Sequence, residues 1–230
     1  MLRVTVTVLL ATAVCVFAGR ASASHGLFHY LSLGDSSTSS VPSFVDITAD
    51  RAAATLHRKV TVKRLIEEDT VAALEAKVAA SPNTVRTADL ITVNIGVNQV
   101  VRVAFSNGCA ASACARAERA FERQYAALLD HLTALRPVSK ASYRLLTQYN
   151  LPGVFRGAAA TAFTAALRAE NRFVCAQARA RGMRCVDVYR AFNGADGARD
   201  PRATGLVRPD NHPSAKGAAL IASLIAKSGF

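Results

Sequence analysis

The stretch FHYLSLGDSS, residues 28–37, decides the class of fold. It begins with a short apolar run that stops at Gly34, which is typical of a buried strand entering a turn. Apolar residues with helical spacing follow over residues 42–57. A strand that leads directly into a helix is the beginning of a β-α-β unit, so this stretch indicates an α/β protein.

The same alternation continues along the rest of the chain. Further strands are expected over residues 59–65, 89–95, 141–149 and 184–189. Helices are expected over residues 42–57, 70–80, 113–136 and 158–181, with Ser214 as the N-cap of a last one. Five strands that alternate with helices predict a three-layer α/β/α fold around a five-stranded parallel sheet. Functional residues of such sheets lie at the carboxyl ends of the strands.

Residues 1–23 have the pattern of a signal peptide. Arg3 supplies a positive start, residues 4–18 are uncharged and apolar, and Ala21-Ser22-Ala23 matches an A-x-A cleavage site. The apolar run is short for a membrane span, which needs ~20 residues, although a retained N-terminal anchor is the alternative. We therefore expect a secreted or cell-envelope protein, with residues 24–230 forming a single domain.

The composition favours a globular, basic protein. The 230 residues include 51% hydrophobic residues, with 28 Lys and Arg against 16 Asp and Glu. That apolar content argues against a disordered or rod-like chain. The arginines are spread over several predicted helices and do not alternate with stacking aromatic residues, so we expect no nucleic-acid partner. Peripheral contact with an anionic envelope surface is compatible with the charge.

Four cysteines remain after residue 23: Cys109, Cys114, Cys175 and Cys185. An even number in an exported chain suggests two disulfides, for which three connectivities exist. The local pairs Cys109–Cys114 and Cys175–Cys185 are the simplest choice. A zinc site is the alternative, but the chain has no C-x-x-C pattern and no histidine near these cysteines. We therefore expect no metal.

Three loops at predicted strand ends carry groups suited to acyl transfer. Ser36 follows the first strand, Asn98 follows the third, and His212 precedes the last helix. They offer a hydroxyl nucleophile, an amide donor for an oxyanion and an imidazole base. Each residue alone has an ordinary explanation as a turn or loop residue. Their order and placement together predict a serine hydrolase site.

In these loops the chain resembles the GDSL-type hydrolases, also called the SGNH hydrolase superfamily. The resemblance covers about residues 28–230 and implies the flavodoxin-like SGNH hydrolase fold. It also implies that Ser36 is the nucleophile and that His212 is the general base. The Ser36 backbone N–H and the Asn98 side chain would bind the oxyanion, and Asp210 would orient the imidazole. No cofactor is implied.

The sequence departs from the family pattern at three places. Asp210 lies two residues before His212, whereas the family usually has an aspartate three residues before the histidine. A loop could absorb this shift, or a backbone carbonyl could orient the ring. The second block usually contributes a glycine N–H to the oxyanion, and that position falls on Asp69. The third block ends in Gln99 where aspartate is usual.

The expected function is an exported serine ester hydrolase, of the esterase or lipase type, that forms an acyl-enzyme. Its partner would be an ester substrate, which could be a small molecule, a lipid or an acylated glycan, and it would act as a monomer. Leu151 and Phe155 are candidates for lining the acyl pocket, although an ordinary packed loop explains them equally well. The alternative function is a degenerate family member that binds acylated or anionic surface polymers without turnover.

Overall fold

The computed structural model describes residues 26–67, 70–108 and 110–230. Its centre is one parallel sheet with the strand order β2-β1-β3-β4-β5. The strands are β1 (Phe28–Gly34), β2 (Val60–Ile66), β3 (Leu90–Asn94), β4 (Ser142–Leu146) and β5 (Arg184–Val186). The predicted α/β fold with a five-stranded parallel sheet is therefore confirmed.

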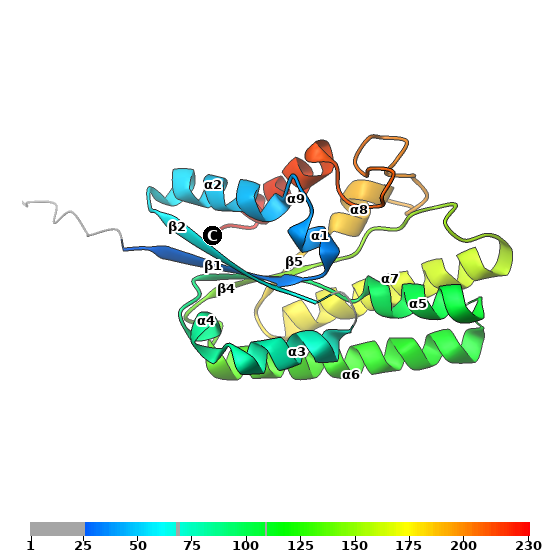
Figure 1. Cartoon of the computed structure of the whole chain (residues 1–230), viewed down its shortest axis with the longest axis horizontal. Helices are drawn as coiled ribbons and strands as arrows, with labels where there is room; N and C mark the ends of the chain where they lie inside the picture. The colour runs from blue at the N-terminus through cyan, green and yellow to red at the C-terminus, as the bar shows by residue number, and fades with distance from the viewer. Residues whose placement is uncertain (1–25, 68–69, 109) are drawn as a thin grey trace, which may run out of the picture.

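Helices cover both faces of the sheet (Figure 1). One side carries α1 (Ser36–Ser39), α2 (Phe44–Leu56), α8 (Val188–Asn193) and α9 (Ala215–Lys227). The other side carries α3 (Val71–Ala80), α4 (Pro82–Arg86), α5 (Val97–Asn107), α6 (Ala111–Leu135) and α7 (Gly157–Ala180). The result is three layers, in which parallel strands are shielded from water on both faces as such strands require.

The alternation of side chains along β1 supplies both halves of the core. Leu31 and Leu33 belong to the cluster beneath α3 and α6, whereas Phe28 and Tyr30 belong to the cluster beneath α2 and α9. All five residues of β3 are buried, which fits its place in the middle of the sheet. The first strand of the chain is thus central in the fold, with β2 and β3 on its two sides.

The structure contains α1 and α4, which were not predicted, and it ends the strand predicted over residues 141–149 at Leu146. Two further stretches differ from the sequence-based expectation. The predicted strand over residues 184–189 ends at Val186, and α8 begins at Val188. The cause is Asp187, whose side chain accepts a hydrogen bond from the Arg190 backbone N–H and caps the helix. The second difference is α5, because the residues after Gly96 were expected to form only a loop.

The C-terminal part of the fold follows the prediction more closely. Ser214 caps α9, since its side chain accepts a hydrogen bond from the Gly217 backbone N–H. The segment before it is rich in turns and contains an isolated antiparallel bridge between Val207 and Pro213. This bridge and the cap fix the loop that leads into α9.

The structure joins Cys175 of α7 to Cys185 of β5 in a disulfide. Cys114 is also disulfide-bonded, and its predicted partner, Cys109, lies outside the described residues. The predicted signal peptide, residues 1–23, lies outside them as well. Within the described part of the chain, no helix combines the length and the apolar character that a membrane span requires.

Candidate active site

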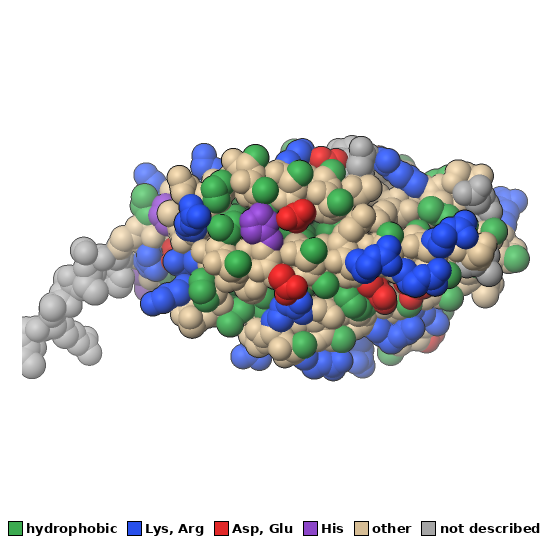
Figure 2. Space-filling view, turned by 90° about the horizontal axis from the view of Figure 1, so that it is seen from below, with side chains coloured by type: hydrophobic (Ala, Val, Ile, Leu, Met, Phe, Trp, Pro, Cys, Tyr) green, Lys and Arg blue, Asp and Glu red, His purple; other side chains and the backbone are tan. Residues whose placement is uncertain are grey.

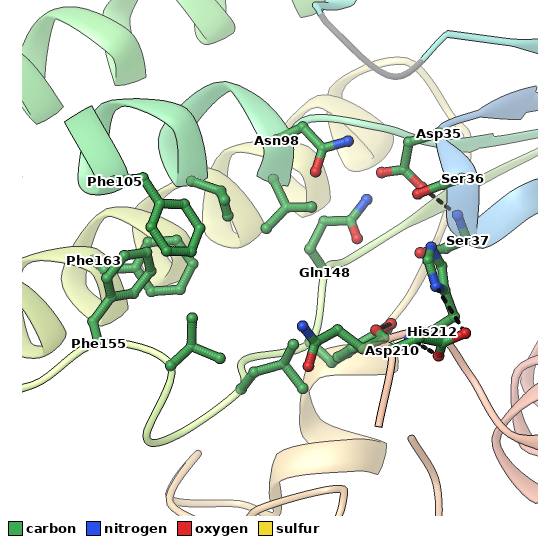
Figure 3. Close-up of a pocket in the computed structure, with 16 residues that line it drawn as sticks. Asp35, Ser36, Ser37, Asn98, Phe105, Gln148, Phe155, Phe163, Asp210 and His212 are labelled. Atoms are coloured by element: carbon green, nitrogen blue, oxygen red, sulfur yellow. Dashed lines mark hydrogen bonds and ion pairs between the residues drawn. The ribbon is translucent and has the colours of Figure 1, made fainter. Parts of the chain in front are cut away.

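A cavity of about 260 Å³ opens at the carboxyl ends of the strands (Figure 3). Six of the residues singled out from the sequence line it: Ser36, Asn98, Leu151, Phe155, Asp210 and His212. They come from the end of β1, the start of α5, the segment after β4 and the loop before α9. The remaining candidate, Asp69, lies outside the described residues. The fold therefore brings together residues that are far apart in the sequence.

The turn that carries Ser36 depends on its neighbours. A Cβ at Gly34 would lie 2.6 Å from the backbone oxygen of Asn94 and 2.1 Å from Oγ1 of Thr38, so only glycine fits there. Asp35 caps α1, because its carboxylate accepts a hydrogen bond of 3.0 Å from the Ser37 backbone N–H. Asp35 thus holds the turn, and Ser36 is the first residue of the short helix.

Asn98 stands in the first turn of α5 and lies between the two ends of the cavity in Figure 3. Gly96 before it has φ 139°, and a Cβ there would lie 2.4 Å from Cε2 of Phe121. The neighbouring Gln99 binds other helices: its Nε2 donates to Gln124 at 2.8 Å, and its Oε1 accepts from the Val71 N–H at 3.4 Å. Gln99 therefore anchors α5 to its neighbours α6 and α3.

His212 is half-buried and sits two residues after Asp210, which is exposed. The Asp210 carboxylate accepts a 3.1 Å hydrogen bond from the His212 backbone N–H, and its Oδ2 lies 3.6 Å from the ring Nδ1. Arg208 also approaches the carboxylate, with Nη2 2.9 Å from Oδ2. The His212 N–H and the Arg208 guanidinium hold the pKa of Asp210 below its usual range. The Asp210 carboxylate is therefore an anion beside the His212 imidazole that also pairs with Arg208.

Tyr149 fixes the other side of the His212 loop. Its hydroxyl donates a 2.7 Å hydrogen bond to the backbone oxygen of Asn211, which has the left-handed φ of 69°. Its ring stacks on the buried Phe192 with centroids 4.9 Å apart. Burial of the phenol raises the pKa of Tyr149, so the hydroxyl keeps its proton and remains a donor. This role of Tyr149 was not predicted from the sequence.

Gln148 forms a further part of the cavity wall, which was not predicted from the sequence. Its backbone is clamped by Asn171, which accepts from the Gln148 N–H at 2.7 Å and donates to its carbonyl at 2.8 Å. Its side-chain Nε2 donates to Oδ1 of Asn94 at 3.0 Å. Gln148 is buried, and these bonds fix the amide between Ser36 and the apolar end of the cavity. Its position near the end of the strand predicted over residues 141–149 was the available signal.

Three phenylalanines line the cavity at the end opposite Ser36 (Figure 3). Phe155 was predicted, whereas Phe105 and Phe163 were not. The spacing of Val97, Val101 and Phe105 at every fourth residue could have indicated one face of a helix. No cluster of three or more His, Cys, Asp or Glu side chains suited to a metal ion occurs in residues 26–67, 70–108 and 110–230.

Comparison with models of protein families identifies the family of this chain. The model of the GDSL-like lipase/acylhydrolase family matches residues 32–220. The chain belongs to this family. A search of curated proteins finds no match. The family assignment agrees with the resemblance drawn from the Ser36, Asn98 and His212 loops.

Solved structures similar to this GDSL-like protein share its fold. The lipase Lip_vut3 from a goat rumen metagenome has a TM-score of 0.74 at 19% identity, covering 88% of this chain and 98% of that chain. A catalytic mutant of Axe2, an acetylxylan esterase from Geobacillus stearothermophilus, has a TM-score of 0.64 at 20% identity, covering 88% and 94%. A lipase/acylhydrolase from Enterococcus faecalis has a TM-score of 0.61 at 16% identity, covering 87% and 94%.

Proposed function

We propose that this GDSL-like protein hydrolyses carboxylic esters through an acyl-enzyme on Ser36. The observation that carries the proposal is that Ser36, Asn98 and His212 line one cavity although the chain places them far apart. A hydroxyl, an amide donor and an imidazole in one cavity are the groups that serine-dependent acyl transfer uses. The family and the solved lipases and esterases of the same fold support the proposal.

The reaction would proceed in two steps. The Ser36 Oγ attacks the ester carbonyl carbon and gives its proton to the His212 imidazole. The oxyanion that forms accepts hydrogen bonds from the Ser36 backbone N–H and the Asn98 amide. The bond between carbonyl carbon and alkoxy oxygen breaks, and the imidazolium returns the proton to the leaving alcohol. A water molecule, deprotonated by His212, then releases the carboxylic acid and restores Ser36.

Asp210 would support the imidazolium as a nearby anion. Its Oδ2 lies 3.6 Å from the His212 Nδ1, which is slightly beyond hydrogen-bond distance, and it shares its charge with Arg208. The imidazolium that forms during attack would draw this carboxylate closer, because catalytic hydrogen bonds tighten as charge develops. The proposal therefore requires Ser36 and His212 and gives Asp210 an electrostatic role.

The test is hydrolysis of p-nitrophenyl butyrate by the mature protein and by two serine variants. Ser36→Ala is expected to lower kcat by about 10⁴-fold or more, because the nucleophile is lost. Ser39→Ala is the matched control, since Ser39 is the exposed last residue of the same short helix. Equal turnover by wild type and Ser36→Ala would contradict the proposal.

Labelling with a fluorophosphonate gives a second readout. Mass spectrometry is expected to locate the adduct on the peptide that contains Ser36. A folded protein that neither reacts with the label nor hydrolyses esters would favour the other candidate, a binding protein for acylated or anionic polymers. That candidate draws its support from the Arg208–Asp210 pair, which holds part of the Asp210 charge away from His212.

We also propose that the chain is exported, cleaved before Ser24 and active as a monomer. The A-x-A pattern at residues 21–23 supports cleavage, and the Cys175–Cys185 disulfide fits an oxidising compartment. Figure 2 shows Lys and Arg side chains at several places on one face, with acidic and hydrophobic side chains between them. A charge distributed in this way suits loose contact with an anionic envelope surface better than a defined polymer site.

A further inference from the structure

The cavity has two ends of opposite chemistry (Figure 3). Ser36 and His212 lie at one end, together with the charged side chains Asp35 and Asp210. The other end, here called the phenylalanine end, is formed by Phe105, Phe155 and Phe163. Among the described residues, the carboxylates that line the cavity are thus confined to the serine end, and the three side chains of the phenylalanine end are apolar.

The three rings of the phenylalanine end form one continuous surface. Phe155 touches both others, with its ring centroid 4.8 Å from that of Phe105 and 4.8 Å from that of Phe163. Phe163 is 5% exposed and packs in the buried cluster that contains Leu167, so it forms a fixed floor. Phe105 is 68% exposed and forms the open rim. The depth of this end is therefore limited by packed protein.

The direction of the acyl group follows from the chemistry of the proposed reaction. The leaving alcohol must lie beside His212 to receive its proton, and the Asp210–His212 loop borders solvent. The acyl group must then point away from His212, past Asn98 toward the phenylalanine end. A sugar or a charged acyl group would lose hydration there without gaining hydrogen bonds.

The volume of the cavity sets the length of the group. An apolar cavity of about 150 Å³ in another protein accommodates benzene, which has six carbon atoms. In proportion, about 260 Å³ has room for about ten carbon atoms. An acetyl group would leave the phenylalanine end unfilled, whereas a chain of about six to ten carbons would contact it.

We propose that the phenylalanine end is the acyl site and that the substrates are esters of unbranched fatty acids of medium length. This inference rests on the proposed function. Phe155 and Phe163 act as specificity-determining residues, because they close the cavity at the end of the chain. Each methylene that enters the apolar end raises kcat/KM by about fourfold, until the chain meets the floor at Phe163.

The test compares p-nitrophenyl esters from two to twelve carbons in the acyl chain. Wild type is expected to prefer chains of about six to ten carbons, Phe155→Ala to shift the optimum to longer chains, and Phe163→Trp to shift it to shorter ones. Phe173→Ala is the matched control, because Phe173 packs on Phe121 and Tyr125 instead of lining the cavity. It should leave the chain-length optimum in place.

Two outcomes of this series would overturn the inference while leaving the proposed hydrolysis intact. One is a preference for the acetyl ester. The other is an unchanged chain-length optimum in Phe155→Ala. Phe155 is half-buried, and its replacement leaves the floor at Phe163 in place. If Phe163→Trp fails to fold, Phe155→Ala and a substitution of the exposed Phe105, Phe105→Ala, still test whether the phenylalanine end sets the chain-length optimum.

Binding to Ser36→Ala separates the acyl site from catalysis. Isothermal titration with decanoate is expected to give one site per chain, weakened about tenfold by the additional change Phe155→Ala. Binding with this loss supports the acyl site even if no ester is turned over, in which case only the proposed function fails. Absence of decanoate binding, or binding that Phe155→Ala leaves unchanged, overturns the inference.

Discussion

Glu170 is a carboxylic acid enclosed in the contact between α6 and α7. Glu170 is 2% exposed, and neither of its carboxyl oxygens has a hydrogen-bond partner among the described residues. Burial raises the pKa of Glu170 well above its usual value, and Glu118 and Glu122 on the facing helix raise it further. Glu170 therefore keeps its proton to a higher pH in the folded protein than in the unfolded chain.

This difference makes stability depend on pH with a definite sign. The unfolded chain loses the Glu170 proton near pH 4.3, whereas the folded protein retains it, so unfolding releases a proton above that pH. The free energy of unfolding then falls by up to about 1.4 kcal/mol per pH unit, until the pH reaches the folded pKa. From pH 5 to pH 7 this contribution amounts to as much as about 2.6 kcal/mol.

Glu170→Leu removes this titration and puts an apolar side chain where the carboxyl group has no hydrogen-bond partner among the described residues. Urea unfolding followed by circular dichroism at pH 5, 6 and 7 measures the effect. The variant is expected to gain stability over wild type progressively as the pH rises. Thr161→Leu is the control: Thr161 is exposed on α7 and has no titratable group, so its effect should be the same at each pH. Parallel curves for Glu170→Leu and wild type would refute the reasoning.

Two further substitutions test how the site is held. Gly96→Ala should lower both stability and ester hydrolysis, because φ 139° is unfavourable for alanine and its Cβ would lie 2.4 Å from the Phe121 ring; thermal unfolding and kcat/KM measure this, and wild-type values for both would contradict it. Tyr149→Phe removes the 2.7 Å hydrogen bond to the Asn211 carbonyl and should cost about 1 kcal/mol. Its kcat should fall by more than its KM rises, since the loop of the general base loosens; an unchanged kcat would exclude this role.

Local periodicity was sufficient to predict the fold because buried strands and amphipathic helices have distinct patterns. It failed at α8, where the alternation of Val186, Asp187 and Val188 suits a strand. The deciding interaction is the hydrogen bond from the Arg190 N–H to the Asp187 side chain. It caps α8, so a helix begins at Val188 and the strand does not continue. It also failed at α5, where polar residues in the first turn obscured the helix.

The candidate site could be predicted from the sequence only for residues with reactive or polar side chains. Ser36, Asn98 and His212 carry reactive or polar groups at strand ends, so sequence alone could single them out. Phe163 lies in the middle of a chain region that reads as an ordinary helix, and it reaches the cavity because α7 packs beside α5. Gln148 likewise forms part of the cavity wall only because a hydrogen bond to Asn94 fixes its side-chain amide.

The cavity draws on the beginning, the middle and the end of the chain, which has a consequence for how the protein matures. A nascent chain that has emerged only as far as α7 contains Ser36 and Asn98 but lacks His212. The base arrives when the loop before α9 is placed, and α9 packs against α2, which follows the Ser36 turn (Figure 1). Under the proposed mechanism, turnover would therefore report completion of the whole fold, and no partly synthesised intermediate would cleave esters prematurely.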